Sequence, residues 1–377
     1  MIFRGLGTIA VFCLVLLLVA ASLAYGAANA ALKDVFAKDF LVGVALNNDQ
    51  IAEKEPNEAT LIIKQFNSIS PENVLKWEKI HPEPNRYDFE LADKYVEFGQ
   101  KNNMFIIGHT LVWHHQTPGW VFEDANGKPI DRETLLVRMK DHIFTVVGRY
   151  KGRVDGWDVV NEAVGSGGRL RKTKWLDIIG KDFIEKAFEY AHEADPNAEL
   201  YYNDYDLWIK DHRAVAVRIV KDLQAKGQRI DGVGMQGHWS LDSPPLNEIE
   251  ATINAFAELG VKVMITEMDV SVLPSASNVT GADIAQNFEL RKELNPYPDG
   301  LPAEVQKKLA KRYAELFSLF HKHAGTISRV TFWGLHDGIS WRHNWPVRGR
   351  TDYPLLFDAD CKPKPAFDAV IKVVKSE

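Results

Sequence analysis

Short apolar runs alternate along the chain with longer stretches that mix charged and apolar residues. The eight runs rich in Val, Ile and aromatic residues are 40–46, 66–70, 104–113, 154–160, 199–205, 230–239, 261–270 and 327–335. The stretches between them place apolar residues at helical spacing, most clearly at 134–150 and 302–323. Strands that alternate with helices predict a parallel sheet, and eight repeats predict that this sheet closes into a single (β/α)8 TIM barrel. The second run is the weakest of the eight because it is short and polar.

Two segments are too long to be ordinary connections between a strand and the next helix. They span about 271–300 and 337–365. Long loops in a compact domain usually serve a function. We therefore expect both segments to contribute to function as well as to connect strands with helices.

The N-terminus reads as a secretory signal. Arg4 precedes an apolar run over 9–24, and Ala28-Asn29-Ala30 matches the small-residue cleavage pattern. We predict that residues 1–30 are a cleaved signal peptide and that residues 31–377 are the catalytic barrel domain. An uncleaved anchor is the alternative, since the run is nearly long enough to span a bilayer. Cleavage predicts a secreted or periplasmic protein without stable membrane association.

Composition narrows the class of partner. The 377 residues are 46% hydrophobic and carry a net charge of -6, and no basic stripe is present, so we expect no nucleic-acid partner. Of the two cysteines, Cys13 lies in the apolar N-terminal run, which leaves Cys361 without a partner for an internal disulfide. A chain of this size is stable on its core alone. We expect a monomer.

Polar and aromatic residues gather at the ends of seven of the eight predicted strands. They are Glu72, Asn73, His109, Trp113, Asn161, Glu162, Asn203, Tyr205, Gln236, His238, Glu267, Asp269, Trp333 and Asp337. The C-terminal ends of barrel strands meet at one mouth, which is where such enzymes carry their active sites. Because a hydrophobic core has little use for so many polar groups, the set predicts an active site.

Two glutamates suggest the chemistry. Glu162 follows the fourth predicted strand and Glu267 follows the seventh, so a barrel brings them to opposite sides of one mouth. Facing carboxyl groups suit cleavage of a glycosidic bond, because one donates a proton to the leaving oxygen while the other attacks or activates water. Taken singly, each glutamate has a plainer interpretation as a loop cap or an arginine partner.

The neighbours of the two glutamates favour the catalytic interpretation. Asn161 offers an amide to the 2-hydroxyl of a sugar, a contact that strengthens in the transition state. His238 shares a strand face with Gln236, and Asp269 shares one with Glu267. We expect Asp269 to orient His238, and His238 to donate to Glu267 and keep it ionised. An isolated His238 would instead be interpreted as an ordinary buried histidine.

Aromatic side chains provide a second indication of a sugar site. Trp113, Trp333 and Trp341 fall at or just beyond predicted strand ends, and indole rings stack on the apolar faces of sugars. Trp113 and Trp333 are alternatively plain barrel core. Lys76, close to Asn73, is positioned to bind a distal sugar, although a solvated helix charge is the simpler alternative.

Two other motifs are rejected. Residues 232–237 match G-x-G-x-x-G, but they lie in the sixth run and lead into a segment with Pro244 and Pro245 where a dinucleotide fold needs a helix. His109, His114 and His115 lack the spacing of a zinc site, and no H-E-x-x-H is present. We therefore expect neither a metal nor a cofactor.

Nine segments together resemble glycoside hydrolase family 10, the secreted endo-β-1,4-xylanases. They are "ENVLKWEKIHP", "GHTLVWHHQTPGW", "WDVVNEAV", "YYNDYD", "GVGMQGHW", "ITEMDV" and "ELNPYPDGLP" with the later "RVTFWGLHDGISW" and "RGRTDYPLLFD". The resemblance spans about residues 36–374 and implies a (β/α)8 barrel that hydrolyses xylan with retention. It also implies that xylan and xylo-oligosaccharides are the binding partners.

The resemblance assigns roles to individual residues. Glu162 matches the acid/base and Glu267 the nucleophile, with Asn161 and His238 near the nucleophile. The positions that match contacts at the nonreducing end of the substrate are Glu72, Asn73, Lys76, His109, Trp113, Gln116, Gln236, Trp333 and Trp341. Asn203 and Tyr205 match positions toward the reducing end.

Some features depart from the family pattern or leave alternatives open. The segment 275–289 is longer than expected, and the segment 340–350 varies where family members vary, so the preferred chain length of the substrate stays open. Another β-1,4-glycanase on the same barrel, such as a cellulase or mixed-linkage glucanase, is one alternative. A non-catalytic xylan-binding protein is another, although the presence of both glutamates counts against it.

Overall fold

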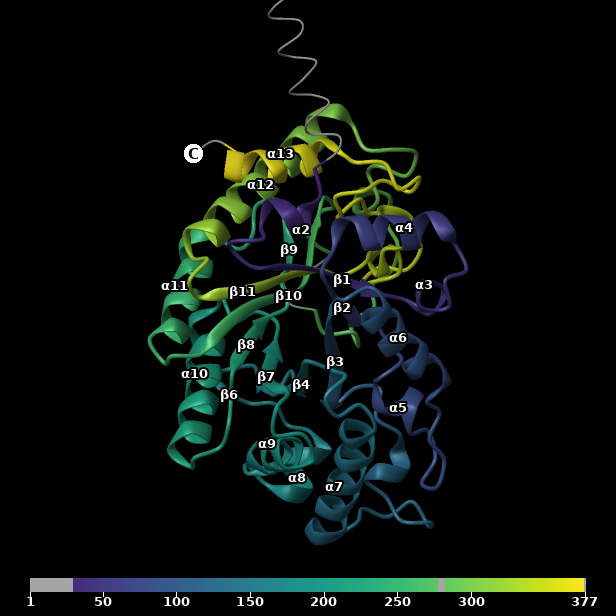
Figure 1. The fold of residues 1–377 in the computed structure, drawn as a ribbon, viewed down its shortest axis with the longest axis vertical. Helices are drawn as coiled ribbons and strands as arrows, with labels where there is room; N and C mark the ends of the chain where they lie inside the picture. The colour runs from purple at the N-terminus through teal and green to yellow at the C-terminus, as the bar shows by residue number, and fades with distance from the viewer. Residues whose placement is uncertain (1–29, 277–281, 376–377) are drawn as a thin grey trace, which may run out of the picture.

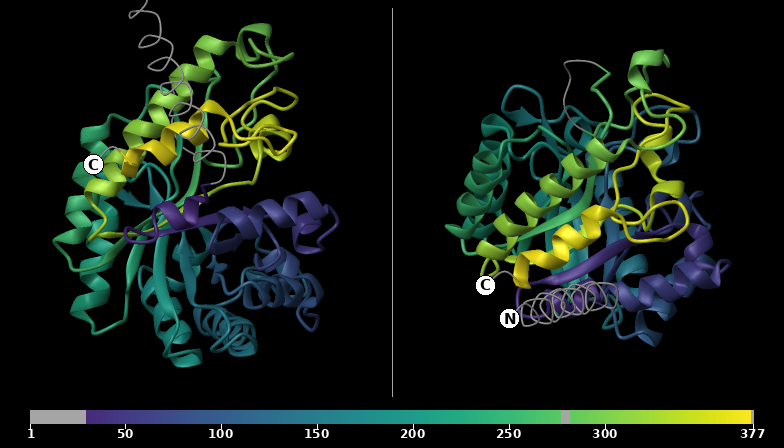
Figure 2. Two further views of the ribbon diagram at one scale, coloured as in Figure 1. Left: turned by 45° about the horizontal axis from the view of Figure 1, so that its top comes forward. Right: turned by 90° about the horizontal axis from the view of Figure 1, so that it is seen from above.

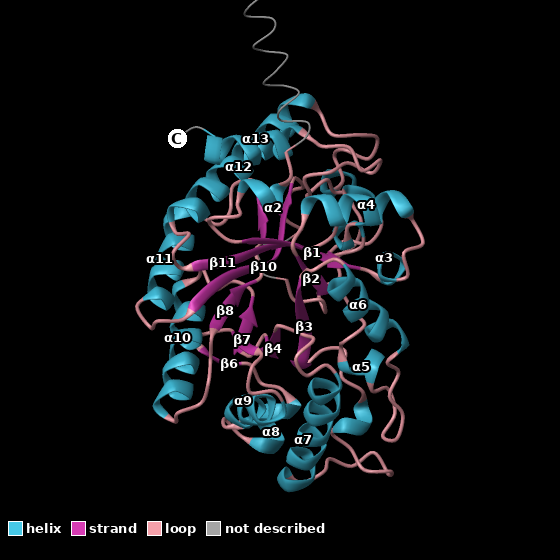
Figure 3. Ribbon diagram, viewed as in Figure 1, coloured by secondary structure: helices cyan, strands magenta, loops and turns pink. Residues whose placement is uncertain are grey.

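Eight parallel strands form a closed barrel in the computed structural model, which describes residues 30–276 and 282–375 (Figures 1 and 3). The strands are β1 Leu41–Leu46, β2 Ser68–Pro71, β3 Phe105–Val112, β4 Gly156–Asn161, β7 Glu199–Asp204, β8 Gly232–Met235, β10 Lys262–Ser271 and β11 Ile327–Phe332. They pair in this order, and β11 closes the ring by pairing with both β10 and β1. The predicted (β/α)8 barrel is confirmed, and each of the eight predicted runs overlaps one strand of the barrel, the short second run included.

Helices surround the barrel (Figure 1), and the last two helices of the chain lie side by side on its outside (Figure 2). The longer ones are α4 Pro56–Gln65, α6 Glu90–Lys101, α7 Arg132–Arg149, α9 Phe183–Ala194, α10 Lys210–Ala225, α11 Leu246–Ala257, α12 Ala303–Lys322 and α13 Pro365–Lys375. The shorter ones are α2 Leu32–Val35, α3 Asn48–Ile51, α5 Trp77–Ile80 and α8 Lys174–Ile179. The helices expected at 134–150 and 302–323 are confirmed as α7 and α12.

Helix α7 illustrates why these segments fold as they do. The side chain of Asp131 accepts a hydrogen bond from the backbone N–H of Thr134 and so caps the first turn. Leu135, Met139 and Ile143 recur every four residues and are fully buried. This spacing places them on one helix face, which packs against the barrel.

The apolar core has two parts because strand side chains alternate in direction. The larger part lies between the sheet and the helices and includes Val42, Val44 and Leu46 of β1. Ile107 and Tyr201 belong to a separate cluster together with Met264. Since their sequence neighbours pack toward the helices, these three side chains fill the barrel interior.

Residues 232–237 form β8 and a turn into the short strand β9, His238–Ser240, so no helix opens at this glycine motif. Gly237 has a φ of +84°, and a Cβ atom there would lie 2.7 Å from Ile265. A Cβ atom on Gly234 would lie 2.2 Å from the side chain of Asn203. These glycines therefore allow β8 to approach its neighbouring strands closely.

The remaining short elements lie in loops. Strands β5 Val164–Gly165 and β6 Arg169–Leu170 pair in a small hairpin, and the 3-10 turns are η1 Gly119–Val121, η2 Lys292–Leu294, η3 Asp337–Ile339 and η4 Trp341–His343. Within the described ranges, no helix is both long and apolar enough to cross a membrane. The predicted signal peptide, apart from Ala30, lies outside the described residues.

Candidate active site

A cavity of about 180 Å³ lies at the C-terminal ends of the barrel strands. It is lined by Glu72, Asn73, Lys76, His109, Trp113, Gln116, Asn161, Glu162, Gln236, His238, Glu267, Ala282, Ile284, Trp333 and Trp341. The predicted site residues therefore converge, except that Asn203, Tyr205 and Asp269 do not line the cavity. Ala282 and Ile284 come from the long segment after β10, which the sequence suggested as functional without naming residues.

Glu162 lies directly after β4, and its backbone φ is +59°, a value that residues other than glycine rarely adopt. Its Oε2 accepts a hydrogen bond from Trp113 Nε1 over 2.8 Å, and its Oε1 accepts one from Gln236 Nε2 over 2.9 Å. Burial raises the pKa of Glu162, and the charge of Glu267 adds to this rise, although the two hydrogen bonds oppose it. The net rise favours the protonated carboxylic acid, which is the form that donates a proton.

The surroundings of Glu267, on β10, favour its ionised form. Asn203 Nδ2 donates to its Oε1 over 2.8 Å, and His238 Nε2 lies 3.1 Å from its Oε2. Burial alone would raise the pKa of Glu267, but the hydrogen bond from His238 and the charges of His109 and His238 outweigh it, so the pKa is lowered. Two carboxyl groups in one cavity with pKa values displaced in opposite directions make an acid and a nucleophile.

Asp269 lies behind His238, as the spacing of two residues predicted. Its Oδ2 is 3.0 Å from His238 Nδ1 and accepts a hydrogen bond from Trp341 Nε1 over 2.7 Å. Burial would lower the pKa of His238, but the adjacent Asp269 carboxylate outweighs it and the pKa rises to about 9. His238 is therefore an imidazolium near neutral pH, and it donates to both carboxylates.

Arg342 completes this charged group and was missed from the sequence. Its Nε donates to Asp269 Oδ1 over 2.6 Å, and both side chains are almost fully buried. A buried site with two carboxylates and one imidazolium needs another cation to offset desolvation. That requirement, together with the position of Arg342 directly after Trp341, is the signal that would have identified it.

Asn203, which the resemblance places toward the reducing end of the substrate, lies beneath the catalytic cavity and not at its surface. Asn203 is fully buried, and its amide lies 2.9 Å from the amide of Asn161 while it donates to Glu267. Its Oδ1 accepts a hydrogen bond from Thr266 Oγ1 over 2.6 Å. With every polar atom engaged inside the protein, Asn203 positions Glu267 and Asn161 and has no surface to offer a substrate.

Tyr205 also differs from its expected placement. Its hydroxyl forms a hydrogen bond with Arg171, and it belongs to an apolar cluster with Ala282 and Trp345, against which Trp341 packs; Tyr205 is only 7% exposed. Tyr205 is covered because the segment that contains Ala282 lies over it. Arg171, which the sequence analysis did not identify, also donates from Nε to the backbone oxygen of Glu162 over 3.1 Å.

The remaining polar side chains occupy the part of the cavity formed by the loops after β2 and β3. Asn73 Oδ1 accepts hydrogen bonds of 3.3 Å from Lys76 Nζ and from Gln116 Nε2, and Lys76 Nζ lies 4.9 Å from the centre of the Trp113 ring. Burial raises the pKa of Glu72 to about 7, although Lys76 opposes the rise. This network presents amide, ammonium and carboxyl groups beside an indole ring, as a sugar site requires.

Comparison with known proteins agrees with this geometry. The model of the family described as Glycosyl hydrolase family 10 matches residues 31–373. The chain is 47% identical to Endo-1,4-beta-xylanase A of Xylanibacter ruminicola over 362 residues, which cover 96% of this chain and 98% of that protein. It is 44% identical to Endo-1,4-beta-xylanase of Geobacillus stearothermophilus over 344 residues, or 91% and 98% of the two chains.

Solved structures give the same result. A GH10 endoxylanase retrieved from a sugarcane soil metagenome superposes with a TM-score of 0.89 at 45% identity, covering 91% of this chain and all of that one. A mutant solved in complex with xylotriose superposes with a TM-score of 0.81 at 38% identity, covering 91% of this chain and 99% of that one. The fold, the two glutamates and the match over residues 31–373 lead to one conclusion: the chain belongs to glycosyl hydrolase family 10.

Proposed function

We propose that the protein is an endo-1,4-β-xylanase that hydrolyses internal bonds of xylan with retention of configuration. The observation that carries the proposal is the pair Glu162 and Glu267, which line one cavity with pKa values displaced in opposite directions. The relatives support xylan as the substrate. Both are named endo-1,4-beta-xylanases, and the match covers almost the whole length of each.

In the first step, Glu267 attacks the anomeric carbon and forms an ester bond to it. The bond between that carbon and the leaving oxygen breaks, and the proton of Glu162 passes to the leaving oxygen. His238 and Asn203, which donate to Glu267, hold it in place and ionised before the attack. Asn161 holds the 2-hydroxyl of the reacting sugar, where the developing charge strengthens the contact.

In the second step, Glu162 acts as a base. It takes a proton from a water molecule, the water oxygen bonds to the anomeric carbon, and the ester to Glu267 breaks. Because each step inverts the anomeric carbon, the product keeps the β configuration. Once Glu267 is esterified, its charge no longer raises the pKa of Glu162, which makes the change of role possible.

The other lining residues bind the sugars on the nonreducing side of the bond in this proposal. Glu72, Asn73, Lys76 and Gln116 offer hydrogen bonds, and Trp333 and Trp341 offer apolar faces. Asp269 acts through His238, and Asn203 acts through Glu267, so both are positioning residues.

Azide rescue tests the two assignments. With a xylobioside that has a good leaving group, Glu162→Ala should still form the ester, and azide should then give the β-azide. Glu267→Ala should give the α-azide, because azide enters directly on the face that the carboxylate has vacated. Azide products of the opposite hand would reverse the assignments. Glu289→Ala, at an exposed glutamate, is the control and should turn over normally without azide.

The competing β-glycanases are separated by substrate. Release of reducing sugars should be far faster from xylan than from cellulose or mixed-linkage glucan. Binding to xylan without release of sugars would instead support a non-catalytic binding protein.

Secretion is a second part of the proposal. We infer that residues 1–30 are removed and that the barrel domain, residues 31–377, acts outside the cytoplasm as a monomer. N-terminal sequencing of the protein recovered from cells should begin at Ala31, and an N-terminus at Met1 in the membrane fraction would favour the anchor. Light scattering of the mature protein should give the mass of one chain.

A further inference from the structure

The described part of the long segment after β10 crosses the mouth of the barrel. We call residues 282–286 the strap. β10 is the seventh strand of the ring and lies opposite β3, yet the strap reaches loops that follow β3 and β4. Two of its side chains, Ala282 and Ile284, line the catalytic cavity. The strap therefore borders the catalytic cavity and is attached to loops on the side of the barrel away from β10.

Asp283 fastens the strap to the far side of the opening. Its Oδ1 lies 3.2 Å from His115 Nε2, and its Oδ2 accepts a hydrogen bond from Arg171 Nη1 over 3.4 Å. Its backbone oxygen accepts a hydrogen bond from Trp345 Nε1 over 3.0 Å. Since Arg171 also bonds the backbone of Glu162, one carboxylate links the strap to the loop of the proposed acid.

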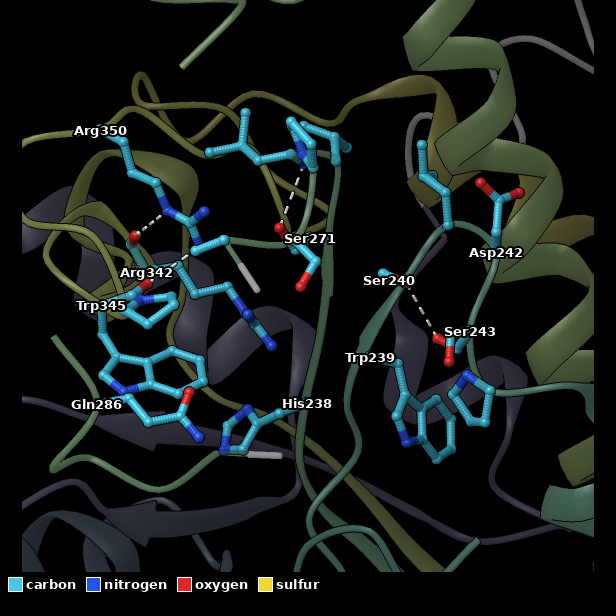
Figure 4. A pocket seen from close by; sticks show the side chains of 18 of the residues that line it. His238, Trp239, Ser240, Asp242, Ser243, Ser271, Gln286, Arg342, Trp345 and Arg350 are labelled. Atoms are coloured by element: carbon cyan, nitrogen blue, oxygen red, sulfur yellow. Dashed lines mark hydrogen bonds between the residues drawn. The ribbon is translucent and has the colours of Figure 1, made fainter. Parts of the chain in front are cut away.

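The strap also borders a second cavity. The second cavity, of about 370 Å³, is drawn in Figure 4, where Gln286, Arg342 and Trp345 form one group of side chains and Trp239, Ser240, Asp242 and Ser243 form another. His238 lines both cavities, and the strap contributes Ala282 and Ile284 to one and Gln286 to the other. The strap thus contributes to the walls of both cavities.

The strap affects the side of the site where the leaving sugar must go. Glu162 protonates the leaving oxygen, and Tyr205, close to it through Arg171, is covered by Ala282 and Trp345. The catalytic cavity of about 180 Å³ is smaller than the roughly 300 Å³ at which ligand pockets usually begin. An enzyme that cuts internal bonds needs room for sugars on both sides of the bond.

We propose that Asp283 is a specificity-determining residue, which holds the strap across the cleft so that a xylan chain passes only when the strap lifts. The proposal rests on the proposed function. Substrates with a very small leaving group react beneath the closed strap, whereas a leaving oligosaccharide requires the open form. The apparent affinity for long substrates is then reduced by the fraction of molecules that are open.

The variant Asp283→Asn tests the proposal, because it removes the charge while keeping an oxygen for the backbone N–H of Ala285. The two substrates are xylohexaose and β-xylobiosyl fluoride, whose leaving group is a single atom. We expect kcat/KM for xylohexaose to rise about two- to tenfold, the range that a partly exposed ion pair with Arg171 and a hydrogen bond with His115 can supply. For the fluoride it should stay within about twofold of the wild-type value.

Asp299→Asn, at an exposed aspartate of the same long segment, is the matched control and should change neither value. His115→Phe removes only the hydrogen bond between His115 and Asp283 and should shift kcat/KM for xylohexaose in the same direction, so the test does not depend on one variant. If kcat/KM of Asp283→Asn for xylohexaose equals the wild-type value, or if kcat/KM changes equally for both substrates, the proposal is overturned. Failure of the wild-type protein to hydrolyse the fluoride would refute the proposed function instead.

Discussion

His238 Nε2 lies 3.1 Å from Oε2 of Glu267, which places an imidazolium directly against the proposed nucleophile. Because Asp269 raises the pKa of His238 to about 9, this contact is charged throughout the neutral range. The hydrogen bond and the charge both stabilise the carboxylate of Glu267 relative to the carboxylic acid. The acid side of the pH profile therefore depends on His238.

His238→Gln should lower kcat by about 10²- to 10³-fold, the loss usual for one electrostatic donor in an active site. It should also raise the pKa of Glu267, so the acidic limb of kcat/KM moves to higher pH. The measurement is the pH profile on an aryl xylobioside. His323→Gln is a matched control, because His323 also pairs with a carboxylate, Glu250, but lies just before β11 at the other end of the barrel. An unmoved acidic limb would contradict the assignment.

The basic limb of the pH profile of kcat/KM depends on Trp113. Its Nε1–H donates to Glu162 over 2.8 Å and stabilises the charged form of that carboxyl. Trp113→Phe removes this donor, which should raise the pKa of Glu162 further and move the basic limb of kcat/KM to higher pH. Trp120→Phe loses a comparable hydrogen bond, to the backbone oxygen of Pro82, and should leave the limb in place. A shift of the Trp113 variant to lower pH would be the wrong sign for this contact.

Glu72 should make substrate binding depend on pH. Burial raises its pKa to about 7, so the side chain is protonated below that pH and charged above it. A charged carboxylate binds a sugar hydroxyl more strongly, so the KM of the wild-type protein should fall as pH rises through about 7. Glu72→Gln should keep KM within about twofold of wild type on the acid side and lack the fall. Glu55→Gln, at an exposed glutamate, should show the same dependence of KM on pH as the wild type. If KM of Glu72→Gln falls with pH in parallel with that of the wild type, Glu72 is not the group responsible.

Hydrophobic periodicity was enough to predict the barrel. Each run that became a strand is buried on both faces, so it stands out as a continuous apolar segment, and α7 and α12 show the four-residue repeat of a packed face. The site followed from the same pattern, because parallel strands bring their C-terminal ends together. Glu162 and Glu267 meet for that reason alone.

What the sequence did not predict depends on the path of loops and on packing between strands. Arg342 lies in the single 3-10 turn η4 and Arg171 lies in a loop, and no periodicity indicates which buried group either side chain approaches. Tyr205 is buried in a cluster with Ala282 of the strap and Trp345, which come from loops far from it in the sequence. Asn203 turns inward because Gly234 on the next strand leaves room for its amide, a relation visible only once the register is known.

A buried pair of histidines should control stability at low pH. His142 on α7 stacks on Trp77 with 3.7 Å between ring centres, and its Nδ1 lies 3.2 Å from Nδ1 of His81. Only one of these two nitrogen atoms carries the shared hydrogen, so a further proton breaks the bond. His142 Nε2 has no hydrogen-bond partner among the described residues. Burial, together with the charge of His81, lowers the pKa of His142 well below its ordinary value of 6.5.

The sign of the pH dependence follows from this lowered pKa. Below pH 6.5 the unfolded chain binds a proton at His142 that the folded protein does not, so the free energy of unfolding falls as the pH falls. One such group contributes at most about 1.4 kcal/mol per pH unit. His142→Phe keeps the ring stack on Trp77 but cannot titrate, so its stability should fall less steeply by about that amount. Urea unfolding at pH values of about 7.5, 6 and 5 measures the slopes. An equally steep fall for His142→Phe would show that the histidine pair is not the source.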